Sequence, residues 1–148
     1  MEDHASIAPA ARLLGYAGLL PLVGAAMGLM LLPMHRALLL DAGFGYAALI
    51  YSFLGGLWWG QGVAQGRASA WLFGLAVVPS LLAWGLMLLQ RLGWTSTQAL
   101  LVLAAAILVS PVVDLVLARS GSPARGWLAL RFQLSTGLGL LTLALALL

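Results

Sequence analysis

The sequence predicts an all-α polytopic integral membrane protein, a bundle of five transmembrane helices with short loops. Of the 148 residues, 63% are apolar and 7% are charged, whereas about a quarter of the residues in a soluble domain are charged. The mean hydropathy is +1.05, and the apolar residues gather into five long segments. Seven arginines and four acidic residues cannot cover the surface of a soluble protein of this length, so we expect residues 1–148 to form a single transmembrane domain.

Each of the five segments is close to the ~20 apolar residues that a helix needs to cross the hydrocarbon core. The expected spans are residues 13–32, 42–64, 70–89, 97–118 and 127–148. The first follows Glu2 and Asp3 and is longer than the apolar core of a signal peptide, so we expect it to remain in the membrane rather than be cleaved. The other spans each follow a short break that holds arginine and turn-forming residues, in order Pro33–Arg36, Gln65–Arg67, Arg91–Gly93 and Arg119–Pro123.

Two of the spans contain a proline, Pro79 in the third and Pro111 in the fourth. We interpret both as kinks, because a helix buried in a bilayer tolerates proline. The hydroxyl of Ser110 is expected to bond a carbonyl that Pro111 leaves free. Since every loop is short, consecutive helices should be antiparallel neighbours. An alternative with four spans and one re-entrant segment stays open.

The arginines predict the orientation, because cytoplasmic loops carry an excess of positive charge. Four lie on the N-terminal side or in the second and fourth loops and two lie in the first and third, namely Arg12, Arg67, Arg119 and Arg125 against Arg36 and Arg91. This distribution places the N-terminus in the cytoplasm and the C-terminus in the periplasm. Abundant leucine, alanine, glycine and arginine without lysine are typical of a GC-rich bacterial genome, which would make the membrane a bacterial inner (cytoplasmic) membrane.

Several kinds of chemistry are excluded by residues that the sequence lacks. Without cysteine there is no disulfide, thiolate nucleophile or cysteine-based metal site, and without lysine there is no Schiff base. His4 and His35 lie outside every expected span, so they cannot hold a haem within the bilayer. At most one acidic residue lies within a span. We therefore expect no catalytic residue, no metal and no cofactor, and the singly scattered arginines favour lipid headgroups over nucleic acid.

Asp114 and Arg131 are the two charges expected inside the membrane, where charges are costly and usually mark a function or a partner. Asp114 lies near the end of the fourth span and Arg131 near the start of the fifth. At 1.5 Å per residue, the hairpin places both about 6 Å inside the same membrane face, so we expect an ion pair. The favoured interpretation is a clasp that locks two helices. A gated pair in a proton or anion path stays open, although such a relay usually needs several ionisable groups in series.

Aromatic residues cluster at the same predicted boundary. An aromatic belt is the favoured interpretation for Trp58, Trp59, Trp71 and Trp127. A second interpretation is that Trp58 or Trp59, together with Gln61, lines a polar pocket beside the expected ion pair. Such a pocket would hold an anionic lipid headgroup or a quinone ring.

Small residues in three spans predict close helix packing. Gly56 and Gly60 form a GxxxG motif, and Gly24 and Gly28 repeat it in the first span. Such pairs let another helix approach closely. In the fifth span a polar stripe at helical spacing is expected to face the bundle, where hydroxyls bond across helices, and consists of Arg131, Ser135, Gly139 and Thr142.

A series of motifs runs along nearly the whole chain, namely Leu14–Pro21, Tyr46 with Ser52–Gly56 and Trp59–Gly60, Val78–Trp84, Asp114, and Leu130–Ser135. In this order they resemble the motifs of the transmembrane protein 69 family, also catalogued as domain of unknown function 3429. One departure is Trp58, where many relatives are expected to carry histidine or arginine. The resemblance implies a five-helix protein of bacterial inner membranes, with relatives in mitochondria, and it implies no activity.

Three functions remain in view. A non-catalytic accessory or scaffold subunit is favoured, binding membrane lipids or a larger membrane complex through its glycine-rich faces, with other subunits or as a homo-oligomer. The alternative is a small transporter or channel that uses Asp114, Arg131 and Gln61. A membrane enzyme acting on lipid is least favoured, because no nucleophile and base are available together. An uncovered glycine face would favour the scaffold, and a water-filled cavity that reaches Asp114 would favour transport.

The predicted orientation can be checked with a reporter enzyme that works only outside the cytoplasm. Fused after Leu148, the reporter should be active, because the arginine count places the C-terminus in the periplasm. The same reporter placed in the second loop should be inactive. Activity confined to the cytoplasm for the Leu148 fusion would overturn either the number of spans or the orientation.

Overall fold

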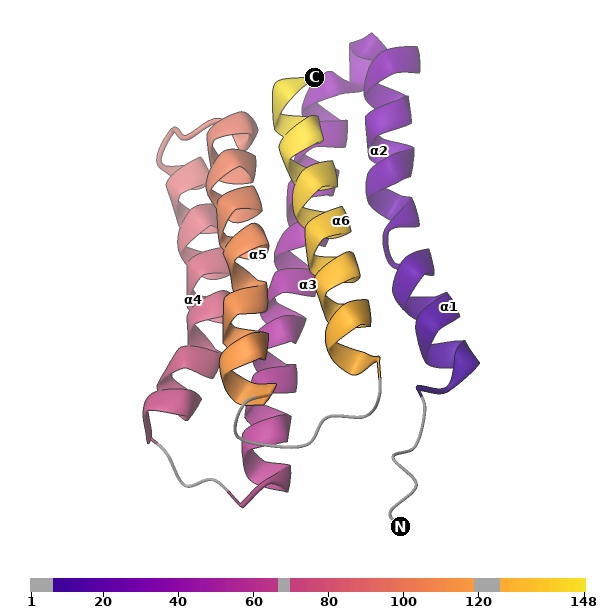
Figure 1. Cartoon of the computed structure of the whole chain (residues 1–148). Helices are drawn as coiled ribbons and strands as arrows, with labels where there is room; N and C mark the ends of the chain where they lie inside the picture. Colours follow the sequence, from indigo (N-terminus) through magenta and orange to yellow (C-terminus); the bar gives the residue numbers. More distant parts are fainter. Residues whose placement is uncertain (1–6, 67–69, 119–125) are drawn as a thin grey trace.

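The protein is an up-and-down bundle of long helices that stand side by side (Figure 1). The computed structural model describes residues 7–66, 70–118 and 126–148, and it is helical throughout those ranges with no strand. The elements are α1 (Pro9–Ala17), α2 (Leu20–Leu31), the short 3₁₀ turn η1 (Pro33–His35), α3 (Arg36–Ala64), α4 (Ala70–Arg91), α5 (Ser96–Ala118) and α6 (Trp127–Leu147). With α1 and α2 counted together as one span, five helices are long and apolar enough to cross a membrane. The predicted fold class is confirmed.

The second span is longer than predicted, because α3 begins at Arg36 rather than at residue 42. The helix runs through Asp41, whose carboxylate accepts a hydrogen bond from the Ser96 hydroxyl at the start of α5. Arg36 Nη1 donates to the carbonyl of Leu148 at 2.8 Å. Charged side chains at this end of α3 are therefore bonded to the ends of two neighbouring helices, and they do not interrupt the helix.

The first span is broken, although the sequence predicted one continuous helix over residues 13–32. Pro21 has no N–H to donate to the carbonyl four residues earlier, and α1 ends at Ala17. The chain tightens here, with Leu19 N donating to the Tyr16 carbonyl at 3.0 Å. Tyr46 on α3 donates its hydroxyl to the carbonyl of Gly18 at 2.7 Å, so a side chain bonds the backbone at the break.

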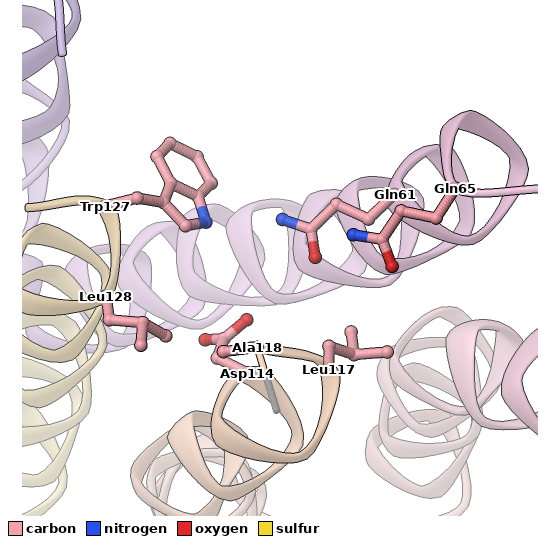
Figure 2. Close-up of a pocket in the computed structure, with 7 residues that line it drawn as sticks. All are labelled: Gln61, Gln65, Asp114, Leu117, Ala118, Trp127 and Leu128. Carbon is pink, nitrogen blue, oxygen red and sulfur yellow. The ribbon is translucent and has the colours of Figure 1, made fainter. Parts of the chain in front are cut away.

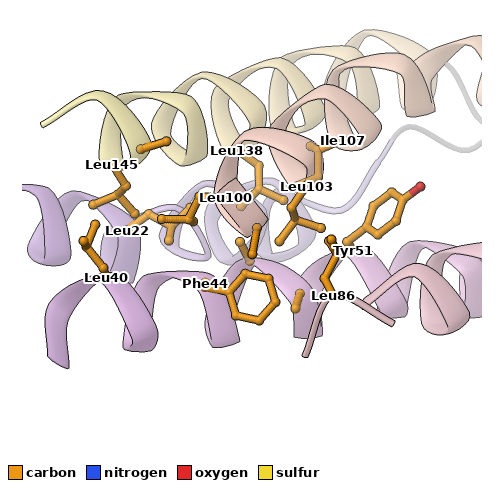
Figure 3. Packing of buried hydrophobic residues seen from close by; sticks show 14 of the residues in the cluster. Leu22, Leu40, Phe44, Tyr51, Leu86, Leu100, Leu103, Ile107, Leu138 and Leu145 are labelled. Carbon is orange, nitrogen blue, oxygen red and sulfur yellow. The ribbon is translucent and has the colours of Figure 1, made fainter. Parts of the chain in front are cut away.

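The two halves of this span are packed very differently. α1 has no buried residue, whereas α2 buries Leu22, Ala25 and Leu29. The apolar core lies where α2, α3, α5 and α6 meet, and α4 adds Ala83 and Leu86 to it (Figure 3). Its fully buried large side chains include Leu22, Leu100, Leu103, Ile107 and Leu145. A smaller cluster of Trp58, Leu72, Ala76 and Leu117 joins α3, α4 and α5.

Both predicted internal prolines lie within uninterrupted helices. Pro79 lies in α4 and Pro111 in α5, and both are buried. Because Pro111 has no N–H, the carbonyl of Ile107 loses its usual donor. The Ser110 hydroxyl donates to that carbonyl at 2.7 Å, which confirms the predicted role of Ser110.

The glycines that bring helices together are mostly not those that the sequence indicated. A Cβ built on Gly55 would lie 2.2 Å from the carbonyl oxygen of Ala76 on α4, so α3 and α4 touch backbone to backbone. By contrast, nothing lies within 4 Å of a Cβ built on Gly24, Gly56 or Gly60. These three glycines therefore pack against no helix in the described part of the chain, and Gly56 faces away from α4 because one residue turns a helix by about 100° from Gly55. Their packing against another molecule stays a prediction.

Two further glycines each pack against a leucine side chain of a neighbouring helix. Gly28, the fourth predicted packing glycine, faces Leu39 on α3, whose side chain lies 3.0 Å from a built Cβ. Gly62 faces Leu72 on α4 in the same way, at 2.8 Å. Three of the arginines that predict the orientation, Arg67, Arg119 and Arg125, lie outside the described residues. The orientation in the membrane stays a prediction.

The neighbouring glycines Gly55 and Gly56 provide a matched pair of variants. Gly55→Ala should lower the free energy of unfolding by about 1–3 kcal/mol, because the new methyl group meets a backbone carbonyl that cannot swing aside. Gly56→Ala meets open space and should be neutral or stabilising by up to about 1 kcal/mol, since alanine is the better helix former. Thermal unfolding in one detergent measures both. Equal stability of the two variants would contradict the close α3–α4 contact.

Candidate functional site

Asp114, Arg131 and Trp58 form a buried polar cluster inside the bundle. Arg131 Nη2 donates to Asp114 Oδ2 at 2.9 Å and to Oδ1 at 3.2 Å, so the expected ion pair is present. Trp58 Nε1 donates to the same Oδ1 at 2.9 Å. The three residues are 5%, 4% and 2% exposed, respectively. The carboxylate thus accepts three hydrogen bonds from two helices, and the cluster joins α3, α5 and α6.

The position of each member follows from helix geometry. α5 and α6 pack closely along their length, which brings Asp114 near the end of one helix beside Arg131 near the start of the other. Trp58 belongs to the buried face of α3, one turn after Leu54 and two turns after Tyr51. The sequence carries no signal that separates Trp58 from Trp59, because apolar residues lie on every side of α3. The aromatic-belt interpretation is wrong for Trp58, because its ring is buried and its N–H is used within the bundle.

The other tryptophans of the predicted belt lie further out. Trp59 is 46% exposed, and its ring packs against Phe73 with centroids 4.7 Å apart. Trp71 is exposed, and Trp127 is half-buried. A belt of Trp59 and Trp71 stays a prediction.

A cavity of about 200 Å³ reaches Asp114 from the end of the bundle where α3 and α5 finish. Figure 2 shows Gln61 and Gln65 on α3 at one side of this cavity and Asp114 on α5 at the other. The remaining wall comes from Leu117, Ala118, Trp127 and Leu128. The structure therefore brings Gln61 near Asp114, as the pocket interpretation expected, while Trp58 and Trp59 do not line this cavity and Trp127 does.

A second cavity of about 420 Å³ lies between α1, α3 and α6. Its wall is largely apolar and includes Leu14, Leu54 and Leu57. Arg131 and Ser135 contribute to it from α6. The two members of the ion pair thus line different cavities, Asp114 the smaller and Arg131 the larger, and Trp127 lines both.

The predicted polar stripe on α6 faces the bundle. Ser135, Gly139 and Thr142 are all buried, like Arg131. Thr142 donates to the carbonyl of Leu138 on its own helix at 2.7 Å. Ser135 meets the hydroxyl of Ser110 on α5 at a distance of 3.5 Å. The inward direction is confirmed, and hydroxyl bonding across helices from Ser135 and Thr142 is limited to this one contact at 3.5 Å.

The described residues offer few groups for catalysis. No group of three or more histidine, cysteine, aspartate or glutamate residues within 7–66, 70–118 and 126–148 could hold a metal ion. Ser52 and Ser80 share a hydrogen bond of 2.7 Å between α3 and α4. The arrangement can bind and orient a neutral or polar group beside a buried, neutralised ion pair.

One family model matches the chain over residues 7–148, and its description is "Protein of unknown function (DUF3429)". The match covers nearly the whole sequence, as the resemblance inferred from the motifs implies. No curated protein and no solved structure matched the chain.

The clasp predicts a characteristic pattern of stabilities. Asp114→Asn should lower the free energy of unfolding by about 3–5 kcal/mol, because it leaves the buried Arg131 charge unpaired. Adding Arg131→Leu should recover much of the loss, since no isolated charge then remains. Thermal unfolding of the purified protein in one detergent compares the two.

Asp41→Asn is the control, because that exposed carboxylate lies at the opposite end of the bundle and the amide oxygen still accepts from Ser96. Its effect should stay near 0.5 kcal/mol or less, as for surface substitutions. The clasp is wrong if Asp114→Asn and Arg131→Leu, made singly, both unfold at the wild-type temperature.

Proposed function

The chain belongs to the DUF3429 family, and on that premise we propose that it is a non-catalytic accessory or scaffold subunit of a membrane. It binds lipid or a larger membrane complex. The observation that carries the proposal is the outer face of α3, which presents two glycines that no part of the described chain covers.

The outer face of α3 is defined by Phe53, Gly56, Gly60 and Val63, which recur at helical spacing along one side. All four are exposed. Glycine within a helix costs about 1 kcal/mol relative to alanine, so two glycines one turn apart are unfavourable unless their space is used. Between larger apolar side chains they form a shallow groove into which a second helix fits closely. This geometry supports docking of another subunit or of a second copy.

The state of the ion pair supports a structural role for the only charges buried among the described residues. Asp114 is already bonded to Arg131 and Trp58. Asp41, the other described carboxylate, bonds Ser96 at the far end of the bundle, so no second acid is placed to continue a relay from Asp114. We further propose the bacterial inner membrane as the location, with the N-terminus in the cytoplasm, on the basis of composition and the distribution of arginines.

A small transporter is the second candidate, and one observation favours it. The cavity lined by Gln61 and Gln65 reaches the Asp114 carboxylate. Movement of a proton or an anion along this route requires the Asp114–Arg131 pair to separate, which leaves two buried charges unpaired and is therefore costly.

The docking proposal is tested by isolating the protein from its native membrane in mild detergent and resolving the recovered mass by native mass spectrometry. Wild type should be recovered with a larger complex or as an oligomer. Gly56→Leu and Gly60→Leu should each reduce that recovery about tenfold or more, because a leucine fills the groove on the outer face of α3. Gly85→Leu on α4 should have no effect, although it too meets open space.

All three leucine variants should retain the wild-type unfolding temperature, since a built Cβ meets nothing within 4 Å at any of the three positions. Retention of the complex by Gly56→Leu and Gly60→Leu would refute the outer face of α3 as the docking surface. A monomeric wild-type protein that moves protons or anions in reconstituted vesicles would favour the transporter instead.

A further inference from the structure

The larger cavity has the size and composition of a site for a small apolar molecule. Its volume is about 420 Å³, within the 300–1,000 Å³ of typical ligand sites. Leucines from α1, α3 and α6 make most of its wall, and Arg131 and Ser135 are its hydrogen-bonding side chains apart from the indole of Trp127. An apolar wall with a few placed polar groups is the usual pattern of such sites.

The cavity exists because the first span breaks. Pro21 prevents a continuous helix, and α1, the half of the span that precedes the break, buries none of its residues. Tyr16 donates its hydroxyl to the side-chain carbonyl of Gln133, which ties α1 to α6. α1 is thus held to α6 at this point while it leaves space in front of α3, where Leu14 and Gly15 face the cavity.

Arg131 is the charged side chain that lines this cavity. The residue is 4% exposed, and its Nη2 is used by both oxygens of Asp114. The Nε atom is closed off and has no hydrogen-bond acceptor in the described part of the chain. A guanidinium has five N–H donors, and the bonds of Arg131 to Asp114 use Nη2 alone, so the guanidinium keeps donor capacity for a ligand in the cavity.

The charge balance determines which acceptor fits. Asp114 already neutralises Arg131. A carboxylate or phosphate ligand would bring a net negative charge into an apolar, buried site, and such a charge is strongly disfavoured there. A neutral carbonyl oxygen accepts the same hydrogen bond without adding charge.

We propose that the cavity between α1, α3 and α6 binds a membrane-soluble molecule with an apolar chain and a neutral carbonyl, whose oxygen accepts a hydrogen bond from the Arg131 guanidinium. An isoprenoid quinone and an acyl ester lipid both carry this chemistry. The chain of the ligand lies against the leucines of α1 and α3. This inference rests on the lipid-binding part of the proposed function, and Phe53 is the one residue that the cavity shares with the outer face of α3.

The test measures binding to the purified full-length protein in detergent by native mass spectrometry, with three probes. A decyl-substituted benzoquinone and a short-chain diacylglycerol both present neutral carbonyls, and decylbenzene has a similar chain and ring without one. The wild-type protein should retain one molecule of at least one carbonyl probe and should bind decylbenzene about tenfold more weakly or worse. Binding of the quinone alone identifies a quinone site, and binding of the diacylglycerol alone identifies an acyl lipid site.

Two variants locate the binding. Arg131→Lys keeps a positive charge for Asp114 but removes the guanidinium and two of its five N–H donors, and it should weaken carbonyl-probe binding about tenfold or more. Ala11→Trp fills the cavity from the exposed helix α1 and should abolish binding, while Ala10→Trp, on the same helix but outside the cavity, should bind like wild type. Unfolding temperatures of all variants show that each is folded.

The proposal is overturned if no carbonyl probe binds, if decylbenzene binds as tightly as the carbonyl probes, or if Ala11→Trp binds like wild type. Its failure is distinguishable from failure of the docking surface. A protein that binds no probe but is still recovered in a complex sensitive to Gly56→Leu loses only this inference, and a monomer that binds the quinone loses only the docking proposal.

Discussion

The hydrogen-bonded ion pair between Asp114 and Arg131 is the interaction on which the interior of this bundle depends. Hydrocarbon offers no water to a charge, so each member requires the other within the protein. Because the two residues lie on α5 and α6, their pairing fixes how these helices face each other. Trp58 adds α3 to the same point through its bond to the carboxylate. One carboxyl group thereby fixes the positions of α3, α5 and α6 relative to one another.

Because hydrocarbon holds no water, backbone N–H and C=O groups also need hydrogen-bond partners within the protein. Each proline in a helix removes one N–H and leaves one carbonyl to be satisfied by another group. Ser110 bonds the carbonyl that Pro111 leaves free. At the break before Pro21, the Tyr46 hydroxyl on α3 bonds the carbonyl of Gly18. Because the span is broken, α1 buries none of its residues against the bundle. The cavity beside Arg131 lies where α1 stands away from α3.

The centre of the bundle and its outer surfaces have different properties. The centre is held by the ion pair and is neutral overall, which suits positioning better than proton transfer. The outer face of α3 leaves two glycines uncovered within the described residues, and the cavity behind α1 has an apolar wall that Arg131 reaches.

The sequence alone determined the class of fold, the number of spans and the pairing of Asp114 with Arg131, because hydropathy and the position of a charge along a hairpin are local properties. It could not decide which side of each helix faces inward. In a membrane both sides are apolar, so no polar face marks the outside. Only the tertiary structure could therefore select Trp58 over Trp59 and Gly55 over Gly56, since one residue turns a side chain by about 100°.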